Sequence, residues 1–464
     1  MNQKFYITTA IDYANDVIHI GHSYQKIIAD VLARYHRLIG NETYFLTGTD
    51  EHGQKVEKNA KENNLNPQKF VDKIATADKA EWKSLNISYG RFIRTTDEDH
   101  IKFAQKFYLK TKAAGDIYLG TYDGLYCEGC EAYLVESDLI DSKCPFHPDQ
   151  EPLHLTEKNY FFRLSKYQKF LEELIEKNPD FVIPESKRRE ALAFIKRGLK
   201  DFAVSRPNIK WGIPVPNDPK QTIYVWFEAL LNYLTYGIEK NCWPADVHVL
   251  GKDNLRFHAI YWPAMLKSAG YELPKTILVH DFISLNGQKI SKSLGNIIRP
   301  SELVEQFGTD GVRYFFLRYG PLRNDVDFTL ERIKEVYNTD LANGLGNLVA
   351  RVAKLCEKAK FKAKKPSKLI LGSKLNQSLN NYRLDEALRF IWKKISEADH
   401  YLDENKPWLL NGDKLNEVLE NLVSKVQEVA FNLQPFLPET AEKILEQFKG
   451  PKIKSEKPLF PRLT

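Results

Sequence analysis

The sequence has no apolar run approaching the roughly 18 residues that a membrane-spanning helix needs, which argues against a membrane partner. The N-terminal stretch MNQKFYITTAIDYAN also lacks the charged and then apolar layout of a secretory signal. A strong excess of one charge is missing too, because 67 basic residues face 61 acidic ones and leave a net charge of +6. Such a mild excess permits a polyanionic partner without requiring one.

Cysteine is also scarce, with only five in the chain. The number is odd, and Cys127, Cys130 and Cys144 fall in one short stretch, which is a poor framework for disulfides. We therefore expect a reducing compartment and a cytoplasmic protein. Cys242 and Cys356 have no neighbouring cysteine in the sequence and are interpreted as ordinary core residues.

The clustered cysteines form a metal-binding pattern instead. Cys127 and Cys130 give C-x2-C, and Cys144 with His147 gives C-x2-H. Three thiolates and one imidazole satisfy a tetrahedral zinc ion and leave no open position, so the pattern predicts one structural zinc. The alternative is a set of reduced, buried cysteines without metal, which two tight ligand pairs disfavour.

The rest of the composition is that of a soluble globular protein. Hydrophobic residues make up 43% and charged residues 28% of the 464 positions, which is enough for buried cores. A chain of this length is expected to form roughly two to four domains.

The first fifty residues have the pattern of a strand, a helix and a second strand. Phe5 to Thr9 is rich in aromatic and β-branched residues. Apolar positions from Ile27 to Leu38 then recur at helical spacing, Gly40 ends the helix, and Thr43 to Thr47 forms the next strand. So short a strand–helix–strand unit predicts parallel pairing and an α/β sheet.

Later segments are expected to rejoin this sheet. Val247 to Leu250 and Thr276 to Val279 are short apolar strands, whereas residues 117–212 interrupt the pattern and are interpreted as an insertion. After about residue 330 the strand signals end, and a helical stripe predicts a bundle, formed by Leu341, Leu345, Leu348, Val352 and Leu355.

Two motifs are suited to handling phosphates. His19-Ile20-Gly21-His22 lies between the first strand and the first helix, where backbone N–H groups favour an anion. Gly21 allows a close approach, and both imidazoles can donate hydrogen bonds. Taken alone, such histidines are also compatible with packing or capping.

The second motif is Lys289-Ile290-Ser291-Lys292-Ser293, which follows a predicted tight turn at Asn286-Gly287. Two lysines in a polar loop suit a charge that develops only in the transition state. A loop of this composition is otherwise usually solvent-facing surface. The order of the two motifs along the chain favours the functional interpretation.

The chain resembles class I aminoacyl-tRNA synthetases, whose two signatures match these motifs. The resemblance implies that His19, His22, Lys289 and Lys292 are catalytic and bind the ATP phosphates. It also places the remaining ATP-binding positions at Gly21, Asp253, Ser291 and Ser293. Ile290 replaces the commoner methionine of the second signature, an apolar exchange of little consequence.

Three further stretches resemble the methionine-specific branch of that class. They are TGTDEHG from Thr47, YVWFEALLNY from Tyr224 and GKDNLRFH from Gly251. A thioether needs a soft, aromatic pocket, and a carboxylate can pair with the substrate ammonium, as Asp50 does by the resemblance. The implied methionine-binding residues are Ile11, Tyr13, Asp50, Trp226, Ala229, Leu230, Tyr233, Phe257, His258 and Trp262. Without the resemblance, most of these aromatic residues would be interpreted as core.

Some positions depart from the usual pattern of the branch. Asp12 stands where proline or tyrosine is more common, and Glu228 stands where aspartate is usual. The insertion of roughly a hundred residues also leaves little room for the large editing domain of the leucine, isoleucine and valine relatives.

The helical region supplies the positions expected to read the tRNA. Asn347 and Arg351 are four residues apart and share a helix face, and Trp408 follows a proline. By resemblance all three bind the CAU anticodon, which is consistent with reading unpaired bases by stacking and hydrogen bonding. Trp408 alone would be interpreted as a packing residue. The chain ends soon after this region, so we expect a monomer.

The resemblance implies activation of L-methionine by ATP with Mg²⁺, and transfer of methionine to the 3′-terminal adenosine of initiator and elongator tRNA(Met). Other interpretations are another class I synthetase, a small-molecule nucleotidylyltransferase and a non-catalytic tRNA-binding relative. The implied architecture is a Rossmann-like α/β catalytic domain with a zinc-knuckle insertion, followed by a helical anticodon-binding bundle. Its expected segments are catalytic residues 1–116, the insertion 117–212, catalytic residues 213–296, a linking segment 297–335 and the bundle 336–464.

Overall fold

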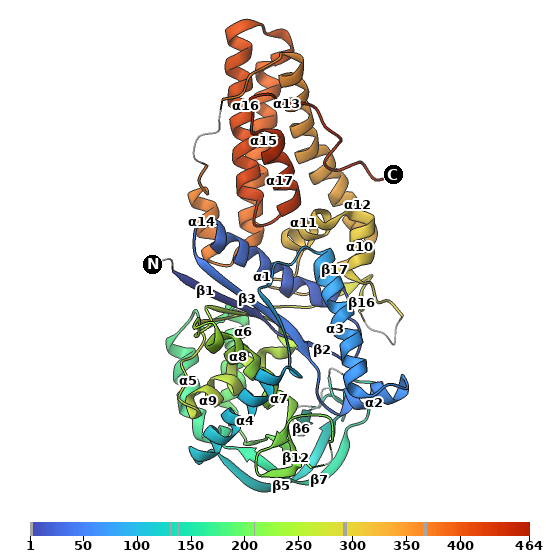
Figure 1. The fold of residues 1–464 in the computed structure, drawn as a ribbon, viewed down its shortest axis with the longest axis vertical. Coiled ribbons are helices and arrows are strands. Elements are labelled where there is room, and N and C mark those ends of the chain that lie inside the picture. The colour runs from blue at the N-terminus through green and yellow to red at the C-terminus, as the bar shows by residue number, and fades with distance from the viewer. Residues whose placement is uncertain are drawn as a thin grey trace.

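The computed structural model describes residues 3–129, 132–134, 136, 139–145, 147–207, 209–290, 295–364 and 369–464. Figure 1 shows three tiers: a helical bundle at one end, a parallel sheet in the middle and antiparallel strands at the other end. Among the described residues, no helix has the length and apolar character needed to cross a bilayer.

The middle tier is a parallel sheet of seven strands in the order β2-β3-β1-β13-β14-β8, with β4 also paired to β3. It confirms the predicted α/β sheet, including the later strands that rejoin it. Its strands are β1 (Lys4–Thr9), β2 (Asp12–Tyr13), β3 (Glu42–Asp50), β4 (Arg91–Arg94), β8 (Val182–Ile183), β13 (Val247–Gly251) and β14 (Thr276–His280).

The strand order reverses at β1. The chain moves from β1 outward to β3 and β4, then returns to the other side of β1 with β13 and β14. Ile7 of β1 is therefore in register with both Phe45 and Val247. In open α/β sheets, the crevice beyond the carboxyl ends of the strands at such a reversal is where ligands bind.

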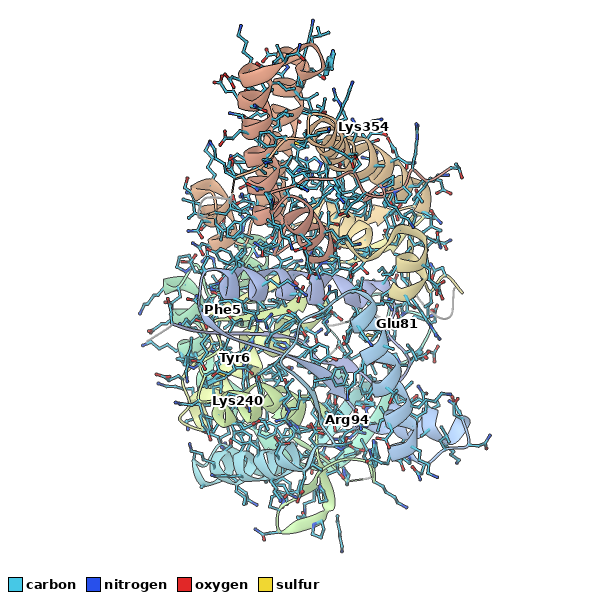
Figure 2. The ribbon with its side chains drawn as sticks, turned by 45° about the horizontal axis from the view of Figure 1, so that its top comes forward. Phe5, Tyr6, Glu81, Arg94, Lys240 and Lys354 are labelled. Carbon is cyan, nitrogen blue, oxygen red and sulfur yellow. The ribbon has the colours of Figure 1, made fainter. Side chains whose placement is uncertain are left out.

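Helices cover both faces of this sheet because successive β1 side chains point to opposite sides. The Phe5 ring stacks on His36 of α1 (Ile20–Leu38), with centroids 3.4 Å apart. The Tyr6 hydroxyl donates to the Tyr233 carbonyl of α8 (Asn232–Glu239) at 2.9 Å on the other face. Figure 2 labels both residues. The remaining helices of the catalytic part are α2 (Gln54–Glu62), α3 (Pro67–Ser84), α4 (Glu98–Ala113), α7 (Val225–Glu228) and α9 (Trp262–Ser268).

Residues 117–212 form an antiparallel sheet and also contribute one strand to the parallel sheet. An antiparallel sheet has the order β6-β5-β7-β9, made of β5 (Ile117–Cys127), β6 (Ala132–Leu134), β7 (Leu153–Phe162) and β9 (Phe202–Ala203). β8 of the same range is the edge strand of the parallel sheet, flanked by α5 (Gln168–Lys177) and α6 (Glu185–Lys196). A further small sheet, β10-β12-β11, comprises β10 (Ser205–Arg206), β11 (Pro214–Val215) and β12 (Asp218–Ile223).

The predicted helical bundle follows the catalytic part. The stripe positions Leu341, Leu345, Leu348 and Val352 are fully buried, as the periodicity indicated, and the last position, Leu355, is half-buried. The helices of this part are α10 (Pro300–Phe307), α11 (Thr309–Tyr319), α12 (Leu330–Val336), η6 (Tyr337–Gly346), α13 (Asn347–Lys358), α14 (Ser373–Asn380), α15 (Leu384–Asn405), α16 (Gly412–Leu433) and α17 (Pro438–Gln447).

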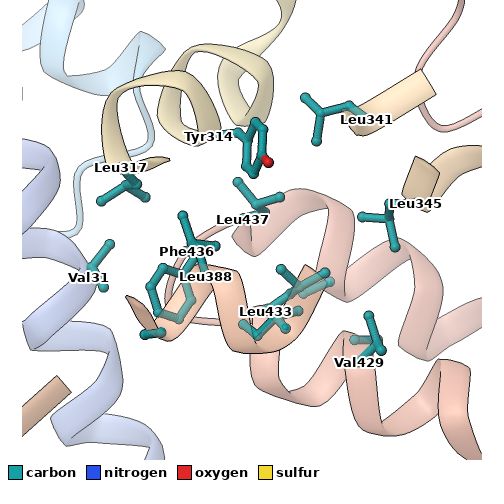
Figure 3. Close-up of a cluster of buried hydrophobic side chains, with 14 of the residues drawn as sticks. Val31, Tyr314, Leu317, Leu341, Leu345, Leu388, Val429, Leu433, Phe436 and Leu437 are labelled. Atoms are coloured by element: carbon teal, nitrogen blue, oxygen red, sulfur yellow. The ribbon is translucent and has the colours of Figure 1, made fainter. Parts of the chain in front are cut away.

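The bundle and the catalytic part share one hydrophobic core. Figure 3 shows Val31 of α1 near Leu317 of α11 and Phe436, which lies between α16 and α17. In the same interface, the fully buried Arg313 guanidinium pairs with Asp30 of α1 at 2.8 Å. A continuous core and a buried ion pair therefore join the helix of the first phosphate motif to the bundle.

Candidate active site

A cavity of about 650 Å³ opens at the carboxyl ends of β1, β3, β13 and β14, at the reversal of the strand order. It brings together most of the residues singled out from the sequence. Those that line it are Ile11, Tyr13, His19, Gly21, His22, Asp50, Trp226, Ala229, Leu230, Tyr233, Asp253, Phe257 and His258.

The first motif forms the N-terminal cap of α1. Nδ1 of His19 accepts a hydrogen bond from the Gly21 backbone N–H at 3.1 Å, and Nδ1 of His22 accepts from the His19 backbone N–H at 3.2 Å. The two rings lie with centroids 4.2 Å apart. This reciprocal capping holds both imidazoles at the positive end of a 19-residue helix, where an anion is stabilised.

Burial fixes the protonation of His22. Its pKa falls to about 4 because the ring is desolvated, and the nearby charge of Lys26 lowers it further. The ring is therefore neutral near pH 7. Nδ1 lies 3.2 Å from both the His19 backbone N–H and the His19 carbonyl oxygen, so the backbone fixes the orientation of a ring that can contact a phosphate oxygen without introducing a charge.

Gly21 is required by the close approach of the His19 ring. A Cβ at this position would lie 2.8 Å from Cε1 and 2.9 Å from Nδ1 of His19. Contacts this short force a neighbour to move. The glycine therefore permits the ring geometry of the motif.

A hydrogen-bonded chain fixes the polar edge of the aromatic pocket. Burial lowers the pKa of His258 to about 4 and raises the pKa of the Tyr233 hydroxyl, so both are neutral near pH 7. Nδ1 of His258 donates to the Asn254 carbonyl at 2.9 Å, which leaves Nε2 to accept from the Tyr233 hydroxyl at 2.8 Å. The pocket thus presents aromatic surface with an ordered hydrogen bond between Tyr233 and His258 at its edge, which suits a thioether side chain.

The other aromatic candidates occupy two different layers. Trp226 and Phe257 line the cavity and stack on one another, with centroids 3.6 Å apart and planes 2° from parallel. Trp262 does not line the cavity. It is fully buried behind Tyr233, and its indole N–H donates to Nε2 of His248 at 3.3 Å.

The two positions that depart from the family pattern are both buried. Asp12 lines the cavity and pairs with Lys26 at 2.9 Å. Glu228 lies outside the cavity lining and contacts His52 at 2.8 Å and His100 at 2.7 Å. Burial alone would raise the pKa of Glu228, but the two histidines outweigh it and hold the pKa below its usual value. Glu228 therefore supports the cavity wall from behind, through α7, which carries Trp226, and through His52, two residues after Asp50.

Sequence reasoning missed His280, which also lines the cavity. Its pKa falls to about 4 on burial, and Nδ1 donates to the Asp281 carbonyl at 2.7 Å. A signal was available, because His280 is the last residue of β14, and polar residues at the carboxyl ends of parallel strands gather at the ligand crevice.

The second motif lies partly outside the described residues. Asn286 and Gly287 both have positive φ, 52° and 74°, which confirms the predicted tight turn. Ile290 is buried and lines the cavity. Lys289 ends the short strand β16 (Gln288–Lys289), paired with β15 (Ile283–Leu285), and its side chain is not described. Ser291, Lys292 and Ser293 lie outside the described residues.

Three of the four predicted metal ligands converge. The ligand atoms of Cys127, Cys144 and His147 lie within 4.8 Å of one another, and Cys127 Sγ is 3.8 Å from His147 Nδ1. Tetrahedral zinc with bonds of about 2.0–2.3 Å separates its ligands by roughly 3.5 Å, so this donor set fits the ion. Cys130 lies outside the described residues. Cys144 and His147 also line the cavity, so the segment that carries the predicted metal ligands forms part of the cavity wall.

The proposed anticodon residues lie in the bundle. Asn347 begins α13 and is exposed, and Arg351 follows one turn later. Arg351 is held by Asp399 at 3.0 Å and Asp403 at 2.5 Å, both on α15. Trp408 lies in the connection after α15 and is 50% exposed, which is unusual for a packing indole.

Comparisons with known proteins agree with this geometry. A family model described as tRNA synthetases class I (M) matches residues 5–152 and 137–353. A methionine–tRNA ligase of Caldanaerobacter subterraneus is 43% identical over 100% of this chain and 79% of its own length. One of Clostridium acetobutylicum is 44% identical, covering 96% of this chain and 73% of its own.

Solved structures agree as well. Mycobacterium tuberculosis methionyl-tRNA synthetase in complex with methionyl-adenylate has a TM-score of 0.92 and 35% identity, covering 99% of this chain and 100% of that one. The apo form of that enzyme has a TM-score of 0.83 and 33% identity, covering 100% and 99%. The strand order, the capped histidine motif and these matches together show that the chain belongs to the methionine-specific class I tRNA synthetases.

Proposed function

We propose that the cavity joins L-methionine to tRNA(Met) in two steps at the expense of ATP. The observation that carries this proposal is the meeting of the capped His19–His22 motif with the Tyr233–His258 pocket in one cavity at the strand reversal. A nucleotide phosphate and an apolar amino acid would there be bound side by side. Family membership gives the reaction class.

In the first step, a carboxylate oxygen of methionine attacks the α-phosphorus of ATP. A new P–O bond forms, the bond to the β-phosphate bridge breaks, and pyrophosphate leaves. In the second step, a hydroxyl of the terminal ribose of tRNA attacks the methionyl carbonyl carbon, and AMP leaves. Such chemistry rests on positioning and charge stabilisation, and Mg²⁺ bound with ATP neutralises phosphate charge.

Each group of residues has a proposed role in the first step. His19 and His22 donate to phosphate oxygens, with Gly21 allowing the approach, and Lys289 and Lys292 stabilise the departing pyrophosphate together with Ser291 and Ser293. Asp253, beyond the end of β13, is placed to bind the ribose hydroxyls. Asp50, at the end of β3, pairs with the methionine ammonium. The proposed walls of the side-chain pocket are Ile11, Tyr13, Trp226, Ala229, Leu230, Tyr233, Phe257 and His258, with Trp262 supporting Tyr233 from behind.

The zinc knuckle and the bundle serve tRNA binding in this proposal. Cys127, Cys130, Cys144 and His147 would hold one structural zinc that keeps the antiparallel sheet folded over the cavity. The anticodon would be read by the exposed ring of Trp408, together with the Asn347 amide and the Arg351 guanidinium. The expected partners are initiator and elongator tRNA(Met), and the expected state is a cytoplasmic monomer with the five segments given above.

The test is amino-acid-dependent ATP–pyrophosphate exchange with Mg²⁺, run separately with all twenty amino acids. Exchange should be strongest with methionine. Strong exchange with a different amino acid would overturn the pocket assignment, and exchange with none, in a folded and zinc-loaded protein, would overturn the activation chemistry. Charging of tRNA(Met) transcripts then tests the second step.

A further inference from the structure

Lys26 places a charge in the interior directly behind the active site. Its ammonium lies 2.7 Å from the Ala10 carbonyl oxygen, 2.9 Å from Oδ2 of Asp12 and 3.1 Å from Oδ1 of the same residue. The side chains of Lys26 and Asp12 are 0% and 2% exposed. This is a complete ion pair inside the protein, and it belongs to none of the motifs discussed above.

Two helices supply the rest of the surroundings of the ammonium. On α1, the side-chain amide of Gln25 donates to the Ala10 carbonyl and to Oδ1 of Asp12, each at 3.4 Å. On α3, the Trp82 ring lies 5.4 Å from the ammonium, and Asp78 accepts a hydrogen bond from the Ile18 backbone N–H at 3.1 Å. Ile18 directly precedes His19, so the same buried cluster also holds the start of the phosphate motif.

Stability alone does not account for such a pair. Removing two charges from water costs more than their attraction often returns, and apolar residues of similar volume commonly replace buried ion pairs without loss of stability. An ion pair does provide conformational specificity that apolar packing lacks, because its directional contacts specify which atoms meet. The contacts of Lys26 specify the position of the chain at Ala10 and Asp12.

That short stretch connects the two halves of the site. It is the corner between β1 and β2, and it carries Ile11 and Tyr13 into the cavity. Lys26 lies four residues after His22, one turn along α1, so the ammonium links the corner to the helix of the histidine motif. The links run through Ala10 and Asp12 to the amino-acid pocket, and through α1 to the phosphate motif.

We propose that Lys26 and Asp12 are a positioning pair that fixes the amino-acid pocket relative to the phosphate motif. Neither residue takes part in the chemistry. The pair sets the distance between the bound methionine carboxylate and the α-phosphorus by tying the β1–β2 corner to α1. This inference rests on the proposed methionine activation and adds two residues that the family's signatures do not contain.

The test uses a double variant, Lys26→Met with Asp12→Asn, which removes both charges and leaves none unpaired. Pyrophosphate exchange should show kcat falling by about tenfold, which is about 1.4 kcal/mol, while the KM values for methionine and for ATP change by less than about threefold, because each subsite stays intact and only their relative position is lost. A purely structural role would lower the unfolding midpoint and leave kcat unchanged. A wild-type kcat in the folded double variant would overturn the proposal.

A second buried pair on the same helix is the matched control. Asp30 lies one turn beyond Lys26 and pairs with Arg313 at 2.8 Å, both fully buried, on the side facing the bundle. Asp30→Asn with Arg313→Met should shift the unfolding midpoint and leave kcat within about twofold of wild type, because it does not touch the corner. Equal losses of kcat in both variants would assign the effect to α1 as a whole and overturn the pair's specific role.

Two further measurements cover a double variant that does not fold and a wild-type protein that is inactive. If the double variant does not fold, Lys26→Met alone removes the contacts to Ala10 and Asp12 and should lower kcat in the same direction, whereas an unchanged kcat overturns the proposal. Wild-type protein measured in the same assay separates the two levels of inference. A wild type without methionine-dependent exchange overturns the proposed function and this inference with it, whereas an active wild type with unaffected variants overturns only the inference.

Discussion

Replacing Gly21 by alanine should damage catalysis without damaging the fold. Gly21 is the second residue of α1 and has no positive φ, so its backbone accepts alanine. Alanine is the better helix former by up to about 1 kcal/mol, which roughly offsets the loss of the capping hydrogen bond to His19, so stability should change little. Any loss of activity then reports on the site itself.

The size of the disturbance follows from the structure. The new Cβ would lie 2.8 Å from Cε1 of His19, whereas carbon atoms in contact prefer about 3.5–4.0 Å, so the ring must retreat by roughly 1 Å. That movement breaks the 3.1 Å hydrogen bond from the Gly21 N–H to His19 Nδ1. A displacement of about 1 Å in a positioned catalytic group can cost roughly 100-fold in rate.

The assay is methionine-dependent pyrophosphate exchange, with thermal unfolding in parallel. We expect kcat to fall about 100-fold and the methionine KM to change by less than about threefold, because the amino-acid pocket is not altered. Gly344→Ala is the matched control, since its Cβ would meet only the Thr339 carbonyl oxygen at an ordinary 3.6 Å. Wild-type exchange by Gly21→Ala would refute the reasoning, because the position of the His19 ring would then not matter.

Three other predictions concern the metal, the bundle and the domain interface. Cys144→Ser should lower bound zinc, measured by plasma mass spectrometry, well below about one ion per chain; full occupancy would contradict a zinc site there. Trp408→Ala should weaken tRNA charging by up to about 1–3 kcal/mol of lost stacking while exchange stays unchanged, and slower exchange would contradict a role confined to tRNA binding. Burial would raise the pKa of Asp30, but Arg313 and Arg34 outweigh it and hold the pKa below its usual value. The stability contributed by Asp30 is therefore fully present above about pH 4, the pKa of an unfolded aspartate, and is lost as the pH falls through the lower pKa of the folded state. The difference in urea midpoint between wild type and Asp30→Asn should accordingly shrink as the pH falls below about 4. A difference that stays constant would argue against the ion pair.

The main sheet could be predicted because its strands carry local signals. Phe5 to Thr9 and Val247 to Leu250 are apolar, β-branched runs, and each lies in a strand of the structure. β8 could not be found in this way, since Val182–Ile183 is only two residues long and gains its identity from pairing with Ile277 and Leu278. Such a strand is defined by tertiary contact, and no periodicity is possible in so short a segment.

The site shows the same division between local and tertiary information. His19 and His22 were predictable because a strand end and a helix start fix where a ligand meets the backbone. The sequence could not distinguish Tyr233, which lines the cavity, from Trp262, which lies behind it, because both are buried aromatic residues on helices of the same face. The contribution of Tyr133 from the inserted sheet to the cavity wall depends on how that sheet sits over the strands, which no local pattern encodes.

The strand order of the parallel sheet has a consequence for how the chain is made. Thr8 of β1 bonds to His248 of β13 across 240 residues of sequence. During synthesis, β1, β3 and β4 can pair early, but the other edge of β1 has to wait for β13 while the inserted segments emerge. An unpaired apolar edge strand is a template for intermolecular pairing, and contacts between distant residues form slowly. The topology that creates the ligand crevice thus also leaves one edge of β1 unpaired in the nascent chain until β13 has been synthesised.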